Sequence, residues 1–179
     1  MKSLLAFGGA VDRVSDLCGY IAKWLVLFAC LVSAGNAFIR YLFSYSSNGW
    51  LEIQWYMFAG IVLLGAAQTL RFNEHVRVDI IYSAISDRAR LWIDILGIIF
   101  FLLPVTIYLT YLTVPFFLIS FEQQEVSNNA GGLILWPVKA VLPLGFILLF
   151  FQGLAELIKR IAALIGLVRI DTTYEAPLQ

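Results

Sequence analysis

The sequence is poor in charge. Of its 179 residues, 13% are Asp, Glu, Lys or Arg, whereas 61% are hydrophobic. Soluble domains carry about 25% charged residues and are about half apolar, so one small core cannot hold this much apolar surface. Lys and Arg together number 12, and so do Asp and Glu. Because there is no basic excess, we expect no nucleic-acid partner, which would need a basic patch or stripe.

Histidine and cysteine are also scarce. His75 is the only histidine, which excludes a haem subunit with two axial histidines. Cys18 and Cys30 lie in one apolar segment, where a helix would separate them by roughly 18 Å, too far for a disulfide, which needs Cα atoms within about 7 Å. The sequence contains no zinc-ligand grouping, nucleophile–base pair, phosphate loop or nucleotide motif. We therefore expect no enzyme, and no metal or cofactor bound by this chain.

Long apolar runs are what the sequence has in abundance. A membrane-spanning helix needs about 20 mostly apolar residues, and four stretches qualify: 20–43, 50–70, 91–119 and 133–157. The links between them are short and polar, and no soluble domain or repeat interrupts them. The sequence predicts an all-α integral membrane protein with four transmembrane helices, in which residues 1–179 form a single membrane domain.

Two further helical segments are expected at the membrane surface. Before the first span, apolar residues recur at helical spacing among charged ones, which predicts an N-terminal amphipathic helix; these are Leu4, Phe7, Val11 and Val14. Between spans two and three, residues 76–85 mix apolar and charged side chains and predict a short interfacial helix. Ser86 then suits an N-cap for the third span.

The distribution of Lys and Arg predicts the orientation. Cytoplasmic loops carry the excess of positive residues. Here the N-terminal side, the middle link and the C-terminal side together hold all of the 12 except Arg40 and Lys139. We expect both termini and the middle link in the cytoplasm, and the links after the first and third spans on the outer side.

Ionisable residues near the spans are the first functional candidates, since they are costly in lipid. Glu52 could pair with a cation on a partner helix, or it could be a helix-start acid at the headgroup level. Lys139 could lie at a subunit interface, or its side chain could extend outward to the lipid headgroups. Arg40 could bond to Asn36 along its own helix or meet Glu52 across the outer link. No carboxylate lies near the centre of a span, which argues against transport by this chain alone.

Small residues suggest close packing between helices. Ala29, Ser33 and Ala37 form a stripe at every fourth position of the first span, and Gly60 and Gly65 lie in the second. Such residues let neighbouring helices approach closely in membranes. The pattern does not say whether the neighbour belongs to this chain or to a partner.

Three local patterns, in their order and spacing, resemble one family. The first is NAFIR at 36–40 followed by WLEIQW at 50–55. The second is LGAA at 64–67 followed by RFNEHVRVD at 71–79. The third is GLILWPVKAVLPLGF at 132–146, ending in QGLAE at 152–156. Together they resemble the small membrane subunit, DctQ-like, of tripartite ATP-independent periplasmic (TRAP) transporters. Ile53 departs from the family pattern, which often has a second acid beside the position of Glu52.

This resemblance implies a function and a set of partners. It implies a helper subunit in the cytoplasmic (inner) membrane of a bacterium or archaeon. That subunit holds a large polytopic transport subunit and helps dock a periplasmic substrate-binding protein, for sodium-coupled uptake of organic acids such as carboxylates. Sodium is expected only in the large partner subunit. The runner-up is a self-contained four-helix carrier that works as a homodimer; a membrane anchor for a redox enzyme is a third alternative. We expect nine residues to be structural or interface residues: Arg40, Trp50, Glu52, Trp55, Arg71, His75, Arg77, Asp79 and Lys139.

Overall fold

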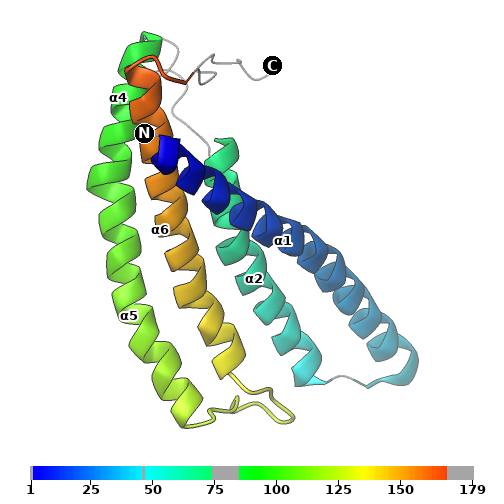
Figure 1. Ribbon diagram of the computed structural model, residues 1–179. Coiled ribbons are helices and arrows are strands. Elements are labelled where there is room, and N and C mark those ends of the chain that lie inside the picture. The colour runs from blue at the N-terminus through cyan, green and yellow to red at the C-terminus, as the bar shows by residue number, and fades with distance from the viewer. Residues whose placement is uncertain (1, 46, 74–84, 169–179) are drawn as a thin grey trace.

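The computed structural model describes residues 2–45, 47–73 and 85–168, and these form long helices (Figure 1). The helices are α1 (Lys2–Phe43), α2 (Asn48–Phe72), α4 (Asp87–Gly97), α5 (Leu103–Glu122) and α6 (Trp136–Leu164). A five-residue π-helical segment, η1 (Ile98–Leu102), joins α4 to α5 without a break. By length and composition, four helical units can cross a membrane: α1, α2, the unit Asp87–Glu122 and α6. The predicted all-α fold with four spans is confirmed.

The N-terminal amphipathic segment and the first span form one continuous helix. α1 has 42 residues and is therefore about 63 Å long, roughly twice the thickness of a hydrocarbon core of about 30 Å. Part of α1 must consequently lie outside the core, or the helix must be steeply tilted. The interfacial helix expected at 76–85 lies almost wholly outside the described residues, and so do His75, Arg77 and Asp79.

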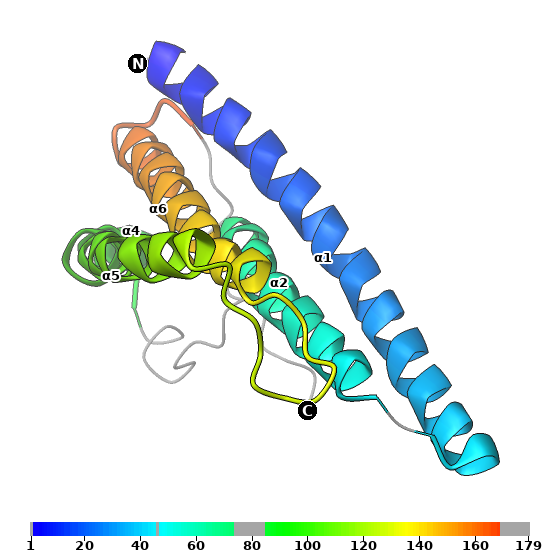
Figure 2. The same cartoon turned by 90° about the horizontal axis from the view of Figure 1, so that it is seen from below.

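The helices lie in a row rather than in a closed bundle. α5 packs against α6, α6 packs against both α2 and α1, and α2 packs against α1. Figures 1 and 2 show α5, α6 and α2 side by side, with α1 crossing obliquely. We call the end where α1 begins and α6 ends the terminal end. The opposite end, which holds the 44–47 and 123–135 links, is the loop end.

Glycine and alanine set the spacing between neighbouring helices. A Cβ atom on Gly145 in α6 would lie 2.6 Å from the Cβ of Leu63 in α2, and one on Gly60 would lie 2.8 Å from Leu25 in α1. A Cβ on Gly65 would lie 3.7 Å from Ala22, an ordinary contact distance. The two glycines singled out in the second span therefore both face α1.

Local sequence explains how the third span begins and bends. Ser86 has extended backbone angles, and its hydroxyl accepts a hydrogen bond from the Ala89 N–H at 3.4 Å, so the predicted N-cap is confirmed. Pro104 lies in the first turn of α5, directly after the π-helical segment. Since proline has no N–H and its ring crowds the preceding turn, the wider π turn suits its position.

Candidate functional site

Glu52 is the centre of a polar cluster at the loop end. It lies in the second turn of α2, yet it is only 4% exposed. One carboxylate oxygen accepts hydrogen bonds from the Ser127 hydroxyl and from the side-chain amide of Asn129, the latter at 2.7 Å. The other oxygen accepts from the backbone N–H of Leu133 at 2.7 Å. All three donors belong to the link between α5 and α6, so the carboxylate fixes this link to α2.

The link itself folds as a small hairpin, residues 125–135. Val126 and Ile134 form an antiparallel bridge, and the Ser127 N–H donates to the Leu133 carbonyl at 2.9 Å. The turn favours glycine at position 131, where φ is +70°, a conformation that costs other residues roughly 1–2 kcal/mol. The fourth span was predicted from residue 133 but begins at Trp136, because residues 133–135 pair within the hairpin.

Two more side chains of α2 donate hydrogen bonds to the hairpin. The Tyr56 hydroxyl donates to the Ile134 carbonyl at 2.9 Å, and the Asn48 amide donates to the Ala130 carbonyl at 3.3 Å. Gly49 lies so close that a Cβ atom there would be 3.2 Å from the Gly131 carbonyl oxygen. The first three turns of α2 thus support the hairpin.

Glu125 and Lys139 form an ion pair at the base of the hairpin. The Lys139 ammonium group also lies over the ring of Phe116, 4.1 Å from its centroid. The hydrogen bond from Lys139 holds the pKa of the Glu125 carboxyl below its ordinary value of 4.5. Lys139 is therefore engaged within its own chain.

A second polar network lies at the terminal end, between α1 and α6. The Ser15 hydroxyl donates to the side-chain oxygen of Gln152 at 2.7 Å, and both side chains are fully buried. The amide nitrogen of Gln152 donates to Asp12 at 3.0 Å and to Glu156 at 3.2 Å. Lys159 bridges the same two carboxylates, at 2.7 Å from Asp12 and 2.8 Å from Glu156.

Two arginines extend this network to α2 and α4. Arg160, 6% exposed, pairs with Glu156 and donates to Asp94 of α4 at 3.0 Å. Arg71 of α2 pairs with Asp16 and lies 3.6 Å from Asp12. Four helices are thus tied together by four carboxylates and three cations: Asp12, Asp16, Asp94, Glu156, Arg71, Lys159 and Arg160. Within the described residues no group of His, Cys, Asp and Glu could hold a metal ion.

The nine residues expected at interfaces have different surroundings. Arg71, Glu52 and Lys139 are engaged inside the chain, as described above. Trp50 and Trp55 are 44% and 64% exposed. Arg40 is exposed, and it has no hydrogen-bond or ion-pair partner in the part of the chain that the structure describes. It therefore meets neither Asn36 nor Glu52.

The small-residue stripe of α1 is only partly covered. Ala29 is 3% exposed, whereas Ser33 and Ala37 are exposed.

Sequence reasoning missed most of the network at the terminal end. Its α6 members, however, recur at helical spacing in an otherwise apolar helix, which was the available indication: Gln152, Glu156, Lys159 and Arg160.

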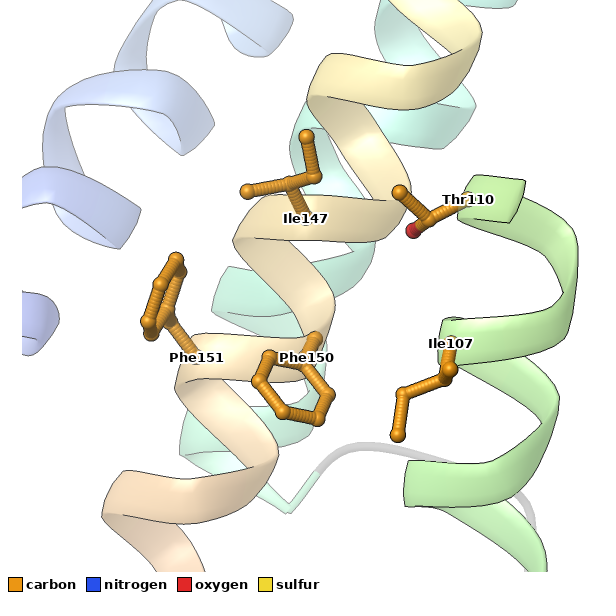
Figure 3. A pocket seen from close by; sticks show the side chains of 5 residues that line it. All are labelled: Ile107, Thr110, Ile147, Phe150 and Phe151. Carbon is orange, nitrogen blue, oxygen red and sulfur yellow. The ribbon is translucent and has the colours of Figure 1, made fainter. Parts of the chain in front are cut away.

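A pocket between α5 and α6 is apolar (Figure 3). It has a volume of about 250 Å³ and is lined by Ile107 and Thr110 of α5 and by Ile147, Phe150 and Phe151 of α6. The Thr110 hydroxyl already donates to the Thr106 carbonyl at 2.7 Å. Specific ligand sites contain a few polar groups that orient the ligand. Among the described residues that line this pocket, the only polar side chain is that of Thr110, whose hydroxyl proton is already donated, so the pocket does not have the polar groups of a specific site.

Comparison with known proteins identifies a family. Residues 29–163, most of the chain, match the family described as "Tripartite ATP-independent periplasmic transporters, DctQ component". No curated protein and no solved structure gives a significant match. The matched range includes the loop end of α1, all of α2, the hairpin and nearly all of α6. The chain belongs to the DctQ family and is the small membrane component of a TRAP transporter.

Proposed function

We propose that this chain is the accessory membrane subunit of a sodium-coupled TRAP transporter that takes up organic acids. It braces the large transport subunit in the cytoplasmic membrane of a bacterium or archaeon and helps dock the periplasmic binding protein. The sodium and substrate sites belong to the large subunit and the binding protein, so this chain carries no cofactor of its own. Membership of the DctQ family supports the part of this proposal that assigns the chain to a TRAP transporter.

The observation that carries the bracing role is the uncovered loop end of α1. Buried residues recur along α1 from Gly8 to Ala29, and none follows in the remaining 14 residues. Figures 1 and 2 show this part of α1 diverging from α2. Its large side chains are strongly exposed: Phe38 is 68%, Tyr41 87% and Phe43 73% exposed.

Lipid alone does not suit this segment. Ser33, Asn36, Ala37 and Arg40 fall on one side of the helix, at positions that repeat every three or four residues. Charged residues in spans are costly in lipid and usually face protein, and small and polar residues pack well against other helices. A helix of the large subunit that carries a carboxylate near Arg40 would satisfy this face.

The orientation follows from the positive residues. With Arg40 and Lys139 as the exceptions among 12 Lys and Arg residues, the positive-inside rule assigns the terminal end to the cytoplasm. The loop end, with the hairpin, then faces the periplasm. A reporter fused at residue 127 would read periplasmic, and a cytoplasmic reading would overturn this assignment.

The alternative is a carrier that works as a homodimer. Carriers bind their substrate at groups near the middle of the membrane. In the described residues, however, the clustered carboxylates lie at the two ends of the helices and are engaged by cations or hydrogen-bond donors. This arrangement favours a structural role for the charges.

One experiment separates the two functions. The tagged chain is purified from its own membranes in mild detergent, and the proteins that accompany it are identified by mass spectrometry. The proposal expects a larger polytopic protein in equal amount, and uptake in liposomes only when this partner and the binding protein are present. A chain that purifies as a dimer of itself and transports a solute alone would overturn the proposal.

A further inference from the structure

The hairpin at residues 125–135 is more firmly held than a connector between two helices needs to be. Its two strands are joined by hydrogen bonds of 2.9 Å from Ser127 to Leu133 and 2.8 Å from Leu135 to Glu125. Glu52 receives three further bonds from it. A surface fixed in advance loses little conformational entropy when a partner binds, which is how a rigid loop gains affinity.

The tip of the hairpin is polar and uncharged. Residues 128–131 are Asn, Asn, Ala and Gly, and all four are exposed. The Asn128 side chain has no partner among the described residues. A surface that faces the lipid tails would be apolar instead. The composition of the tip fits a soluble protein surface that offers hydrogen-bonding groups.

The hairpin also lies beyond the helices. α5 ends at Glu122 and α6 begins at Trp136. At the base, the rings of Phe121 and Trp136 meet edge to face with centroids 5.3 Å apart, and aromatic residues of this kind mark membrane–water boundaries. The tip therefore lies past the ends of α5 and α6, against the first turns of α2, and its exposed side is on the face where the proposed orientation places the periplasm.

We propose that the hairpin tip is the part of this chain that contacts the periplasmic binding protein, and that Glu52 is the positioning residue that holds the tip in its docking geometry. Glu52 is buried and does not touch the binding protein itself. Its two oxygens fix the two strands of the hairpin, Ser127 on one and Leu133 on the other, so its removal frees the tip. This inference rests on the proposed function, because it requires a binding protein.

Glu52→Gln is the sharpest substitution. A glutamine side chain replaces one acceptor oxygen by an NH₂ donor. Turned toward the Leu133 N–H, this NH₂ group faces another donor. Turned the other way, it faces the Ser127 hydroxyl and the Asn129 amide, which must both reverse to accept from it. In either rotamer the charge-assisted bonds to the carboxylate become weaker neutral ones, while size and helix propensity change little.

The test uses the complete transporter in liposomes and varies the concentration of substrate-loaded binding protein. We expect Glu52→Gln to raise the half-saturating concentration of binding protein about tenfold. The uptake rate at saturating binding protein and the yield of large subunit that purifies with the chain should not change. A merely structural role would lower the rate and the yield instead.

Three further variants keep the test decisive. Ser127→Ala removes one of the three bonds and should give a smaller rise, even if Glu52→Gln fails to fold. Asn128→Ala leaves the hairpin bonds intact and should also raise the half-saturating concentration, because it removes a contact of the tip. Glu122→Gln is the matched control: this exposed acid at the end of α5 has no partner among the described residues, and its replacement should change nothing.

The outcomes that would overturn the inference differ from those that would overturn the proposed function. If assembled Glu52→Gln and Asn128→Ala transporters need no more binding protein than wild type, the tip is not the docking surface. If Glu52→Gln releases the large subunit, the hairpin holds that subunit rather than the binding protein. If the wild-type complex takes up substrate without any binding protein, the proposed function itself is wrong.

Discussion

Ser15 in α1 and Gln152 in α6 are joined by a hydrogen bond of 2.7 Å, although 137 positions separate them in the sequence. Neither side chain is exposed to any extent. In a membrane protein, where lipid gives no hydrophobic drive between helices, close packing and polar contacts of this kind hold helices together. The bond fixes the N-terminal half of α1 across α6. Its donor, Ser15, lies before residue 29 and is therefore outside the range that matches the family.

The first prediction concerns Gln152. Gln152→Leu deprives the Ser15 hydroxyl of its acceptor and removes a donor from Asp12 and Glu156. Buried polar groups left without a partner cost about 1–3 kcal/mol each, so the chain should lose at least that much stability. Thermal unfolding in detergent measures the loss. Gln123→Leu, at an exposed position after α5, is the control, and equal melting temperatures for the two variants would contradict the prediction.

Arg160 should be still more sensitive. Its side chain is 7% exposed and faces the carboxylates of Glu156 and Asp94. Arg160→Met leaves two acids without this partner, and breaking a buried ion pair costs about 3–5 kcal/mol. Arg13→Met, at an exposed position of α1, should have little effect. Adding Glu156→Gln to Arg160→Met should restore part of the stability, and a further loss in the double variant would show that the two residues are not coupled in this way.

The Glu125–Lys139 pair predicts a pH dependence at the loop end. Because the folded pKa of Glu125 is depressed below 4.5, the pair stabilises the folded chain above that ordinary value. This contribution is lost as the pH falls from 4.5 through the depressed pKa. The melting temperature of wild type should therefore exceed that of Glu125→Gln at neutral pH, and the difference should shrink in acid. A difference that stays constant down to the lowest pH at which the chain remains folded would contradict this.

Gly145→Ala tests the packing of α6 on α2. A Cβ there would lie 2.6 Å from the Leu63 Cβ and 3.0 Å from its carbonyl oxygen, so the backbones must separate. Overpacking of this kind typically costs about 1–3 kcal/mol. The matched control is Gly35→Ala in α1, where nothing lies within 4 Å and helix propensity favours alanine by about 1 kcal/mol. The two variants should therefore shift the melting temperature in opposite directions, and shifts of the same sign would refute the packing argument.

The sequence was sufficient for the spans, the helical class and the Ser86 cap, because each depends on local composition. Hydrophobic length locates a span within a few residues, and a serine before a helix satisfies an N–H of its own first turn. The start of α6 was placed three residues early for the same reason. Leu133, Ile134 and Leu135 are apolar, and nothing local reveals that they pair with residues 125–127.

The role of Glu52 could not be predicted from the sequence. Its partners Ser127, Asn129 and Leu133 are 75 to 81 positions away, and none of them is charged. Arg40, the nearest cation along the chain on that side, was the partner that opposite charge predicts within this chain. Short polar residues and a backbone N–H satisfy the carboxylate instead, and only the three-dimensional path of the chain brings them together.

Arg40 provides the last prediction, on the bracing role. If its guanidinium group pairs with a carboxylate of the large subunit, Arg40→Ala removes a charge-assisted bond of about 1.5–3 kcal/mol and should lower the amount of large subunit that purifies with the chain. Arg40→Lys should give an intermediate result, because lysine keeps the charge but lacks the planar fork of arginine. Lys23→Ala is the control, since Lys23 is exposed on the same helix and also has no partner among the described residues. If Arg40 instead reaches lipid headgroups, as arginines near span ends can, all three variants will assemble like wild type, and the face of α1 that contacts the partner must then be sought elsewhere.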